Sequence, residues 1–403
     1  MLLRYGATAN GEIEKKAHIY TQAEHGVEAD RIDSDAVWVV RRLRQAGFHA
    51  YLVGGAVRDL LLSRTPNDFD IATDAHPQQI RRCFRSARII GRRFRLVHVY
   101  TRGDRYMEVS TFRSRGALGT ADHRDNPDQN NLFGTMEQDA ERRDFTINAL
   151  YYDPADQQII DYVGGFTDIR QRRLRTLVPA ETSFAEDPVR MIRAAKYSAL
   201  VGFPIPLGMS LLIRRLRESL LGCSRERVTE EVYKILTSGG SVQVLDLLNR
   251  LRLFEVLFPS LSEQFRSDRL RFADSDLAER LRRLDAGVPS GAVLDRSHLF
   301  GFLFRDLLVR RTDLLHGEDP EFLLQEYLRG ASAPLFPSKK DLAVGVELVL
   351  QEVLPSHRKR EPAHPGRIGR PHHGEPPVRG PRPAGAKRRR RRGGGRRPDA
   401  REA

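Results

Sequence analysis

The sequence predicts a mixed α/β (α+β) head, an all-α segment after it, and a disordered basic tail. Short strand and helix patterns alternate up to about residue 178 without a regular parallel repeat. Beyond Pro188 the apolar spacing is helical to about residue 355, and residues 356–403 contain almost no large apolar side chains. Because 403 residues exceed what one compact core usually holds, several domains are expected.

The first half of the head is expected to begin at about residue 31, since residues 1–30 show no apolar periodicity and are predicted to precede the fold. Ser34 is a favourable N-cap for a helix that ends near Gly47. The elements expected next are a strand at 50–53, a helix at 57–62, a strand at 68–72 and a helix from Pro77.

The second half of the head is predicted to contain a hairpin, a helix and a strand. The hairpin strands are 94–101 and 106–112. Thr135 and Gln138 form a capping box for a helix that we expect to continue to Leu150. A strand at 158–163 then leads to a second glycine pair, Gly164 and Gly165.

The positive charge of the chain is concentrated in its tail. Residues 356–403 carry 16 Lys and Arg against 4 Asp and Glu, although the whole chain has a net charge of +14. A segment so poor in apolar side chains is expected to be disordered, and its Arg-rich run suits RNA or another polyanion. That run consists of Lys387, Arg388, Arg389, Arg390, Arg391 and Arg392. A merely solubilising tail is the alternative.

Composition excludes several other classes of protein. Two cysteines, Cys83 and Cys223, are too few for a disulfide framework or a Cys-rich zinc site. No stretch approaches the roughly 18 apolar residues of a membrane helix, and residues 1–16 lack the apolar core of a signal peptide. A cytoplasmic protein that does not bind membranes is therefore expected.

Asp68 and Asp70 are the most informative residues. On a strand, positions i and i+2 project from the same face, so the two carboxylates are expected to lie side by side. Carboxylates this close repel one another unless a cation lies between them, and Mg²⁺ prefers such hard oxygen ligands. An isolated Asp-x-Asp is more often a solvated strand face.

A glycine pair upstream favours the metal interpretation. Gly54 and Gly55 end a predicted strand at the start of a helix, and Arg58 lies one turn into that helix. Glycines allow backbone N–H groups to approach a phosphate, while the helix start and an arginine add positive potential. Together with Asp68 and Asp70, the pair predicts a triphosphate site beside a metal site.

Five motifs resemble those of the class II nucleotidyltransferases, the family of bacterial poly(A) polymerases and CCA-adding tRNA nucleotidyltransferases. They occur in the family's order between about residues 50 and 235. The motifs are 52–71, Arg142 to Leu150, Asp161 to Gly165, Glu186 to Arg193, and Ser224 to Glu231. The resemblance implies a nucleotidyltransferase head at 31–178, a helical neck at 179–240 that binds nucleotide and RNA, and an RNA-binding body at 241–355.

The later motifs carry further candidate residues. Asp144 and Asn148 have the i,i+4 spacing of one helix face, and the resemblance implies that they bind the ribose. It also counts Asp144 with the catalytic carboxylates, and Arg143 could reach phosphate. Asp187 and Arg190 are i,i+3 neighbours, for which the resemblance implies a hydrogen-bonding edge that selects the ATP base. Arg193 falls on the same helix face as Glu186 and Arg190, and the resemblance places it among the ATP-binding residues too. On spacing alone, solvated faces and intrahelical salt bridges would explain these residues.

Two-metal phosphoryl transfer requires a third carboxylate at the metal site. Glu108 is the candidate because it lies in the middle of a predicted strand, where a charge is unusual, and the family commonly has Glu there. Asp104 and Asp144 are the alternatives. The metal ligands predicted from the sequence are therefore Asp68, Asp70 and Glu108.

Residues 89–99 favour the poly(A) polymerase branch of the family. Arg95-Leu96 stands where the tRNA enzymes tend to have Gly-Thr, and Arg92 and Arg93 add cations suited to RNA. The resemblance then implies that AMP from ATP is added to RNA 3′ ends with Mg²⁺ in mRNA processing or decay. RNA-decay proteins are a further class of partner, which the sequence does not identify.

Other functions remain as alternatives. They are a CCA-adding, C-adding or A-adding tRNA enzyme, a small-molecule nucleotidyltransferase, and a non-catalytic RNA-binding protein. In the body, Phe254 and Phe258 are read as core residues, with RNA stacking as the less favoured role.

Overall fold

The computed structural model describes residues 2–7, 13–91, 95–101, 105–114, 133–287 and 295–354. All of these described residues belong to one compact unit. The Arg-rich run at 387–392, Arg92, Arg93 and Asp104 lie outside the described residues, so their predicted roles remain predictions. The boundaries between head, neck and body also remain predictions.

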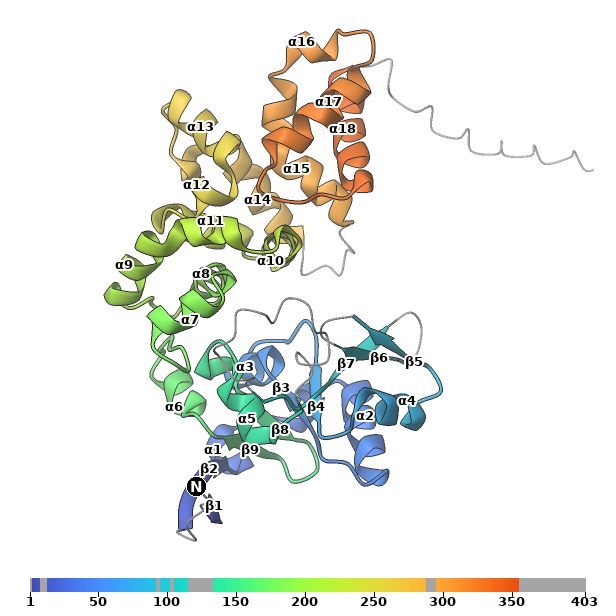
Figure 1. Cartoon of the computed structure of the whole chain (residues 1–403), viewed down its shortest axis with the longest axis vertical. Coiled ribbons are helices and arrows are strands. Elements are labelled where there is room, and N and C mark those ends of the chain that lie inside the picture. Colours follow the sequence, from blue (N-terminus) through green and yellow to red (C-terminus); the bar gives the residue numbers. More distant parts are fainter. Residues whose placement is uncertain are drawn as a thin grey trace, which may run out of the picture. The chain divides into compact units, whose positions relative to one another are not determined.

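The strands of the described residues form one nine-stranded sheet in the order β1-β2-β9-β8-β3-β4-β7-β6-β5. Their bounds are β1 Leu2–Ala7, β2 Ile13–Tyr20, β3 Ala50–Val53, β4 Asp70–Thr73, β5 Ala87–Ile90, β6 Leu96–Tyr100, β7 Tyr106–Thr111, β8 Leu150–Asp153 and β9 Gln158–Asp161. The β4–β7 pair is parallel, whereas the other pairs are antiparallel. The predicted mixed sheet is thereby confirmed, and Figure 1 shows it with its helices.

Several short helices accompany the sheet. They are α1 Gln22–His25, η1 Ala29–Arg31, α2 Ser34–Gln45, α3 Gly55–Leu61, α4 Pro77–Cys83, α5 Met136–Glu141, η3 Thr146–Asn148 and α6 Gly165–Arg170. The apolar side chains of α2, among them Val39 and Leu43, pack in one core with Leu52 and Ile71 of the sheet. A smaller core on other residues of the same strands includes Val53 and Ala72. Because neighbouring strand residues point to opposite faces, both faces of the sheet are covered.

The remainder of the described chain is helical, as predicted. The helices are α7 Ala180–Glu186, α8 Val189–Val201, α9 Leu207–Leu216, η4 Arg217–Gly222, α10 Arg225–Leu236, α11 Ser241–Arg250, α12 Phe254–Leu257, α13 Pro259–Ser267, η5 Phe272–Asp274, α14 Asp276–Gly287, α15 Arg296–Val309, α16 Thr312–Leu315, α17 Pro320–Ala331 and α18 Lys339–Val353. Phe254 and Phe258 are fully buried, which confirms that they are core residues and leaves neither ring free to stack on RNA. No described helix is long and apolar enough to cross a membrane.

Four predictions about local structure were wrong. The N-cap of α2 is Asp33, whose carboxylate accepts from the Asp35 N–H group, and Ser34 is the first residue of the helix. Residues 1–30 do not all precede the fold, since β2 pairs with β9 and buries Ala17 and Tyr20. The helix expected at 135–150 ends at Glu141, because the following segment turns into η3 and then into the buried strand β8. Asp68 does not lie on a strand: β4 begins at Asp70, and Asp68 lies in the exposed segment before it.

Candidate active site

The turn between β3 and α3 brings Gly54 next to two candidate residues. Gly54 has a φ of 78°, a conformation that L side chains rarely adopt. A Cβ atom on Gly54 would lie 3.8 Å from Asp70 Oδ2 and 3.4 Å from Arg143 Nη1. The first glycine of the predicted phosphate site therefore lies beside one carboxylate and one guanidinium of the predicted catalytic set.

Asp70 and Glu108 lie in register on the parallel strands β4 and β7. Paired residues on neighbouring strands point to the same sheet face, so the two carboxylates share a face, as the choice of Glu108 required. His98 on β6 lies on the other side of Glu108, with its Nε2 atom 3.7 Å from Glu108 Oε2.

Asp68 also contributes to the electrostatics of this cluster. Burial, together with the negative charges of Asp68 and Glu108, raises the pKa of Asp70 to about 7, although Arg143 and Lys234 oppose the shift. The charges of two further carboxylates therefore act on Asp70 at the start of β4. The predicted arrangement of Asp68 and Asp70 on one strand face is not formed, since only Asp70 belongs to the strand, although the charge of Asp68 still acts on Asp70.

The donor chemistry of these carboxylates suits a hard divalent cation. A cation among them would remove the repulsion that raises the pKa of Asp70. Among the described residues, however, no three His, Cys, Asp or Glu side chains are close enough together to hold a metal ion as they stand. Mg²⁺ is commonly bound by one or two protein carboxylates together with phosphate oxygens, so Asp70 and Glu108 on one sheet face suit such a site.

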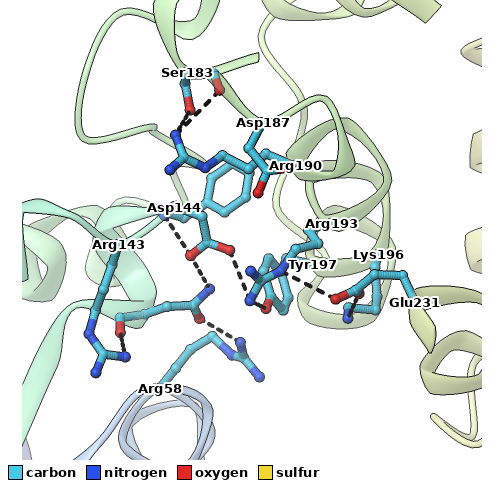
Figure 2. Close-up of polar contacts among 12 residues, drawn as sticks. Arg58, Arg143, Asp144, Ser183, Asp187, Arg190, Arg193, Lys196, Tyr197 and Glu231 are labelled. Atoms are coloured by element: carbon cyan, nitrogen blue, oxygen red, sulfur yellow. Dashed lines mark hydrogen bonds and ion pairs between the residues drawn. The ribbon is translucent and has the colours of Figure 1, made fainter. Parts of the chain in front are cut away.

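A chain of buried polar contacts joins α3 to the segment after α5 (Figure 2). Arg58 Nη1 donates to Asn148 Oδ1 at 2.7 Å, and Asn148 Nδ2 donates to Asp144 Oδ1 at 3.2 Å. Arg58 also pairs with Asp59 at 2.9 Å, and its guanidinium lies 5.1 Å from the Tyr197 ring centroid. Asp144 and Asn148 are thus brought together as predicted, by a 3₁₀ turn rather than by one α-helix face.

The contacts continue from Asp144 into α8 and α10 (Figure 2). Arg193 Nη2 lies 3.1 Å from Asp144 Oδ2, and its Nε lies 3.7 Å from Glu231 Oε1. Glu231 accepts a 2.5 Å hydrogen bond from the buried Lys196. Burial raises the pKa of Asp144, but the charge of Arg193 and the hydrogen bond from Asn148 outweigh it and lower the pKa.

Asp187 and Arg190 are held by other residues rather than by each other's side chains. Arg190 Nη1 donates to Ser183 Oγ at 2.9 Å and pairs with Glu186 at 3.2 Å. Asp187 Oδ2 accepts from Arg227 of α10 at 2.7 Å. The side chains of Asp187 and Arg190 therefore do not pair with each other, and each is held in place by other residues.

Arg143 is fixed by an acid that sequence reasoning missed. The buried Asp139 of α5 pairs with Arg143 at 3.1 Å and also accepts from the Tyr151 hydroxyl at 2.7 Å. Burial raises the pKa of Asp139, but Arg143 and Arg142 outweigh it and lower the pKa to about 2. Its i,i+4 spacing to Arg143 was the available signal, although the same spacing is typical of ordinary surface pairs.

The third motif has a structural role. Asp161 is fully buried, and its carboxylate accepts hydrogen bonds from the backbone N–H groups of residues 163–166. A Cβ atom on Gly165 would lie 2.1 Å from the Thr146 carbonyl oxygen. The motif therefore packs the start of α6 against η3, the turn that carries Asn148.

The strand-end glycine, the facing carboxylates and the buried polar chain together define a nucleotidyltransferase head. A family model described as the Poly A polymerase head domain matches residues 50–175, and one described as a probable RNA and SrmB-binding site of polymerase A matches residues 202–265. The chain belongs to the family of poly(A) polymerases and CCA-adding tRNA nucleotidyltransferases.

Known relatives come from both branches of this family. Poly(A) polymerase I of Salmonella typhi is 37% identical over 71% of this chain, which spans 63% of that relative's length. Poly(A) polymerase I of Haemophilus influenzae is 36% identical, with 75% of this chain and 68% of the relative covered. The crystal structure of the Bacillus stearothermophilus CCA-adding enzyme in complex with CTP covers 80% of each chain at 29% identity and a TM-score of 0.51.

Proposed function

We propose that this chain transfers AMP from ATP to the 3′ end of RNA without a template, as a poly(A) polymerase. The observation that carries the proposal is the placement of Asp70 and Glu108 on one sheet face, with Gly54 beside Asp70. The α-phosphate of ATP, if bound at this point, would lie next to both the carboxylates and the turn that contains Gly54. The similarity to poly(A) polymerase I supports the same activity.

In this proposal the chain's own residues bind and orient the nucleotide. Gly54 and Gly55 leave room for the triphosphate, and Arg143 next to Gly54 supplies positive charge. Asp144 and Asn148 bind the ribose, and Arg58 holds the Asn148 amide in place. The neck contributes Asp187, Arg190 and Arg193 to the nucleotide site. Asp187 and Arg190 recognise the base of ATP.

Asp68, Asp70 and Glu108 are the residues that would hold Mg²⁺. When bound, the metal would supply Lewis-acid activation of the 3′-hydroxyl and charge neutralisation on the departing pyrophosphate. Asp70 must be ionised to act as a ligand, and its raised pKa means that protons compete with the metal near neutral pH. RNA binding by Lys387–Arg392 and a cytoplasmic location remain predictions from the sequence.

A CCA-adding activity is the second candidate, and the similarity to the Bacillus stearothermophilus CCA-adding enzyme favours it. Arg95-Leu96, which replaces the Gly-Thr expected of tRNA enzymes, favours the poly(A) polymerase. A non-catalytic RNA-binding protein would be expected to have lost part of the site. Asp70, Glu108, Arg58, Asp144 and Asn148 all retain the contacts described above.

A matrix of substrates separates the two candidates. The chain is incubated with a generic RNA or with a tRNA that lacks its 3′ end, and ATP and CTP are supplied separately. We expect long A-tails on generic RNA and little incorporation of CMP. Addition of CMP confined to the tRNA would overturn the poly(A) assignment in favour of the CCA-adding one, and no addition in any combination would overturn both.

A further inference from the structure

A basic and aromatic surface lies on α2 and α4 of the head, away from the residues assigned above. We call it the α2–α4 surface and define it by the exposed Trp38, Arg41 and Arg42 on α2 and the exposed Arg81, Arg82 and Arg85 on and just after α4. Trp38 is the only tryptophan of the chain, and 49% of it is exposed. An exposed ring of this size among arginines is unusual for a surface with no partner.

Helical geometry gathers the α2 residues on one face. Trp38, Arg41, Arg42 and Gln45 follow the spacing i, i+3, i+4 and i+7. Gln79, Arg82 and Cys83 repeat this spacing on α4, which contacts α2 (Figure 1). The two helices are joined by the Trp38 and Phe84 rings, which meet edge-on with centroids 5.4 Å apart, and by a long 3.5 Å hydrogen bond from Arg42 Nε to the Cys83 carbonyl oxygen.

A hollow of about 420 Å³ lies between the two helices. It is lined by Arg42, Gln45, Ala46, Phe48, Gln79, Arg82 and Cys83. The lining combines guanidinium groups, which bind phosphate, with amide groups, which can both donate to and accept from base edges.

The charge of the surface is not neutralised by the head. Arg41, Arg81, Arg82 and Arg85 are exposed, and none pairs with an acidic side chain in the described part of the chain. The nearby acids have other partners. Asp74 bonds to His49 at 2.8 Å, Asp153 pairs with Arg44 at 2.6 Å, and Asp33 pairs with Arg105.

The surface lies on the sheet face opposite to the candidate active site. α2 packs in the core that contains Ile71 and Val109. Asp70 and Glu108 directly precede these residues on their strands and therefore point to the other face. A ligand of the α2–α4 surface does not compete with ATP for the carboxylate cluster.

We infer that the α2–α4 surface binds single-stranded RNA upstream of its reacting 3′ end. Proteins that bind single strands combine a cationic groove with aromatic rings on which bases stack, and this surface offers both elements. The unpaired arginines contact phosphates, Trp38 stacks on a base, and Gln45 and Gln79 border the hollow. The inference rests on the proposed function only in taking RNA as the substrate.

The single tryptophan allows this surface to be observed directly in the full chain. Oligo(A) of about 20 nucleotides, longer than the roughly 4–16 nucleotides of a typical single-strand site, is titrated while the fluorescence of Trp38 is measured. We expect the emission to change by at least about a third at saturation, because base stacking alters the surroundings of the ring. ATP without RNA is expected to leave it unchanged. Saturating binding, measured by anisotropy of labelled RNA, without a change in Trp38 emission would overturn the inference.

Charge reversal provides the second measurement. The double variant Arg41→Glu/Arg82→Glu is compared with Arg173→Glu/Arg170→Glu, which makes the same charge change near α6. Loss of two phosphate contacts should reduce the salt slope by about 1.4 and lower RNA affinity at least about tenfold at low salt. The control pair should change affinity less than about threefold by loss of general attraction. Equal losses in both variants would refute a specific site.

A third comparison keeps this inference separate from the proposed function. Addition of one AMP to a saturating short primer should remain within about twofold of wild type in Arg41→Glu/Arg82→Glu, since such a primer does not need upstream contacts. If an acidic protein changed the fluorescence of Trp38 and RNA did not, the occupant of the surface would be that protein rather than RNA, and the inference would be contradicted. If the wild-type protein itself adds no AMP to the primer, the proposed function, rather than this inference, is contradicted.

Discussion

The buried Lys196–Glu231 pair offers the sharpest test of how α8 and α10 support the site. Only 8% of the Lys196 side chain and 10% of the Glu231 side chain are exposed. Glu231 also lies 3.7 Å from Arg193, which pairs with Asp144. Glu231→Gln keeps the size of the side chain but removes the charge that balances two cations. We expect a large loss of stability.

The size of this loss follows from burial. Removing one partner from a buried ion pair typically costs about 3–5 kcal/mol, because the other charge remains unsolvated and unpaired. Glutamine can still accept a hydrogen bond from Lys196, so the lower end, about 3 kcal/mol, is expected. The neighbouring Glu230 pairs with Arg296 on the surface, where both side chains are about half exposed. Glu230→Gln should therefore cost less than about 1 kcal/mol.

The assay is urea unfolding followed by far-ultraviolet circular dichroism for both variants. Burial opposes ionisation of Glu231, but Lys196 and Arg193 outweigh it and hold its pKa below the ordinary value of 4.5. Its stabilising contribution is therefore complete above that value and is lost as the pH falls through the lower pKa of the folded state. The difference between wild type and Glu231→Gln should shrink on acidification. A Glu231→Gln loss no larger than that of Glu230→Gln would refute the reasoning.

Three further predictions concern the head and the nucleotide site. Gly165→Ala should destabilise the chain by about 2–3 kcal/mol in urea unfolding, because the added Cβ atom would clash with the Thr146 carbonyl oxygen. The control Gly208→Ala, where the Cβ atom would enter open space, should not destabilise the chain, and equal effects of the two substitutions would contradict the packing argument. Asp70→Asn should stabilise the metal-free protein by about 4 kcal/mol at pH 8 and by less than half of that at pH 5, because a carboxyl whose pKa rises from 3.8 to about 7 on folding costs progressively more stability as the pH rises between these two values. A pH-independent difference would contradict the cluster. Arg190→Ala should reduce the preference for ATP over CTP, measured as the ratio of kcat/KM values, by about tenfold, and an unchanged ratio would remove Arg190 from base selection.

Much of the head was predictable from local patterns. The strand at 50–53, the helix beginning at Pro77 and the hairpin formed by β6 and β7 depend on apolar alternation and turn residues that lie within one segment. The pairing of Asp70 with Glu108 depends on the parallel contact of β4 with β7, which no local pattern specifies. Glu108 could be chosen because a charge stood in the middle of a predicted strand and because the family that the motifs resemble commonly has Glu there.

The errors have a common physical cause. Residues 142–150 carry helix-compatible spacing, but tertiary packing against α6 and β3 converts them into a 3₁₀ turn and a strand. Asp139, Lys196 and Glu231 were missed as parts of the site. Apart from Arg142 and Arg143, which are close to Asp139 in sequence, their partners come from distant segments or other helices. A charge next to opposite charges in sequence resembles a surface pair until burial is known.

The most direct test of the account is incorporation of AMP by Asp68→Ala. This exposed residue lies outside the strand, so the variant should keep the circular dichroism spectrum and unfolding midpoint of the wild type. Labelled ATP, Mg²⁺ and generic RNA are supplied to both proteins. Asp68→Ala is expected to incorporate no measurable AMP while the wild type extends the RNA. Incorporation by the folded variant at a rate close to that of the wild type would contradict it.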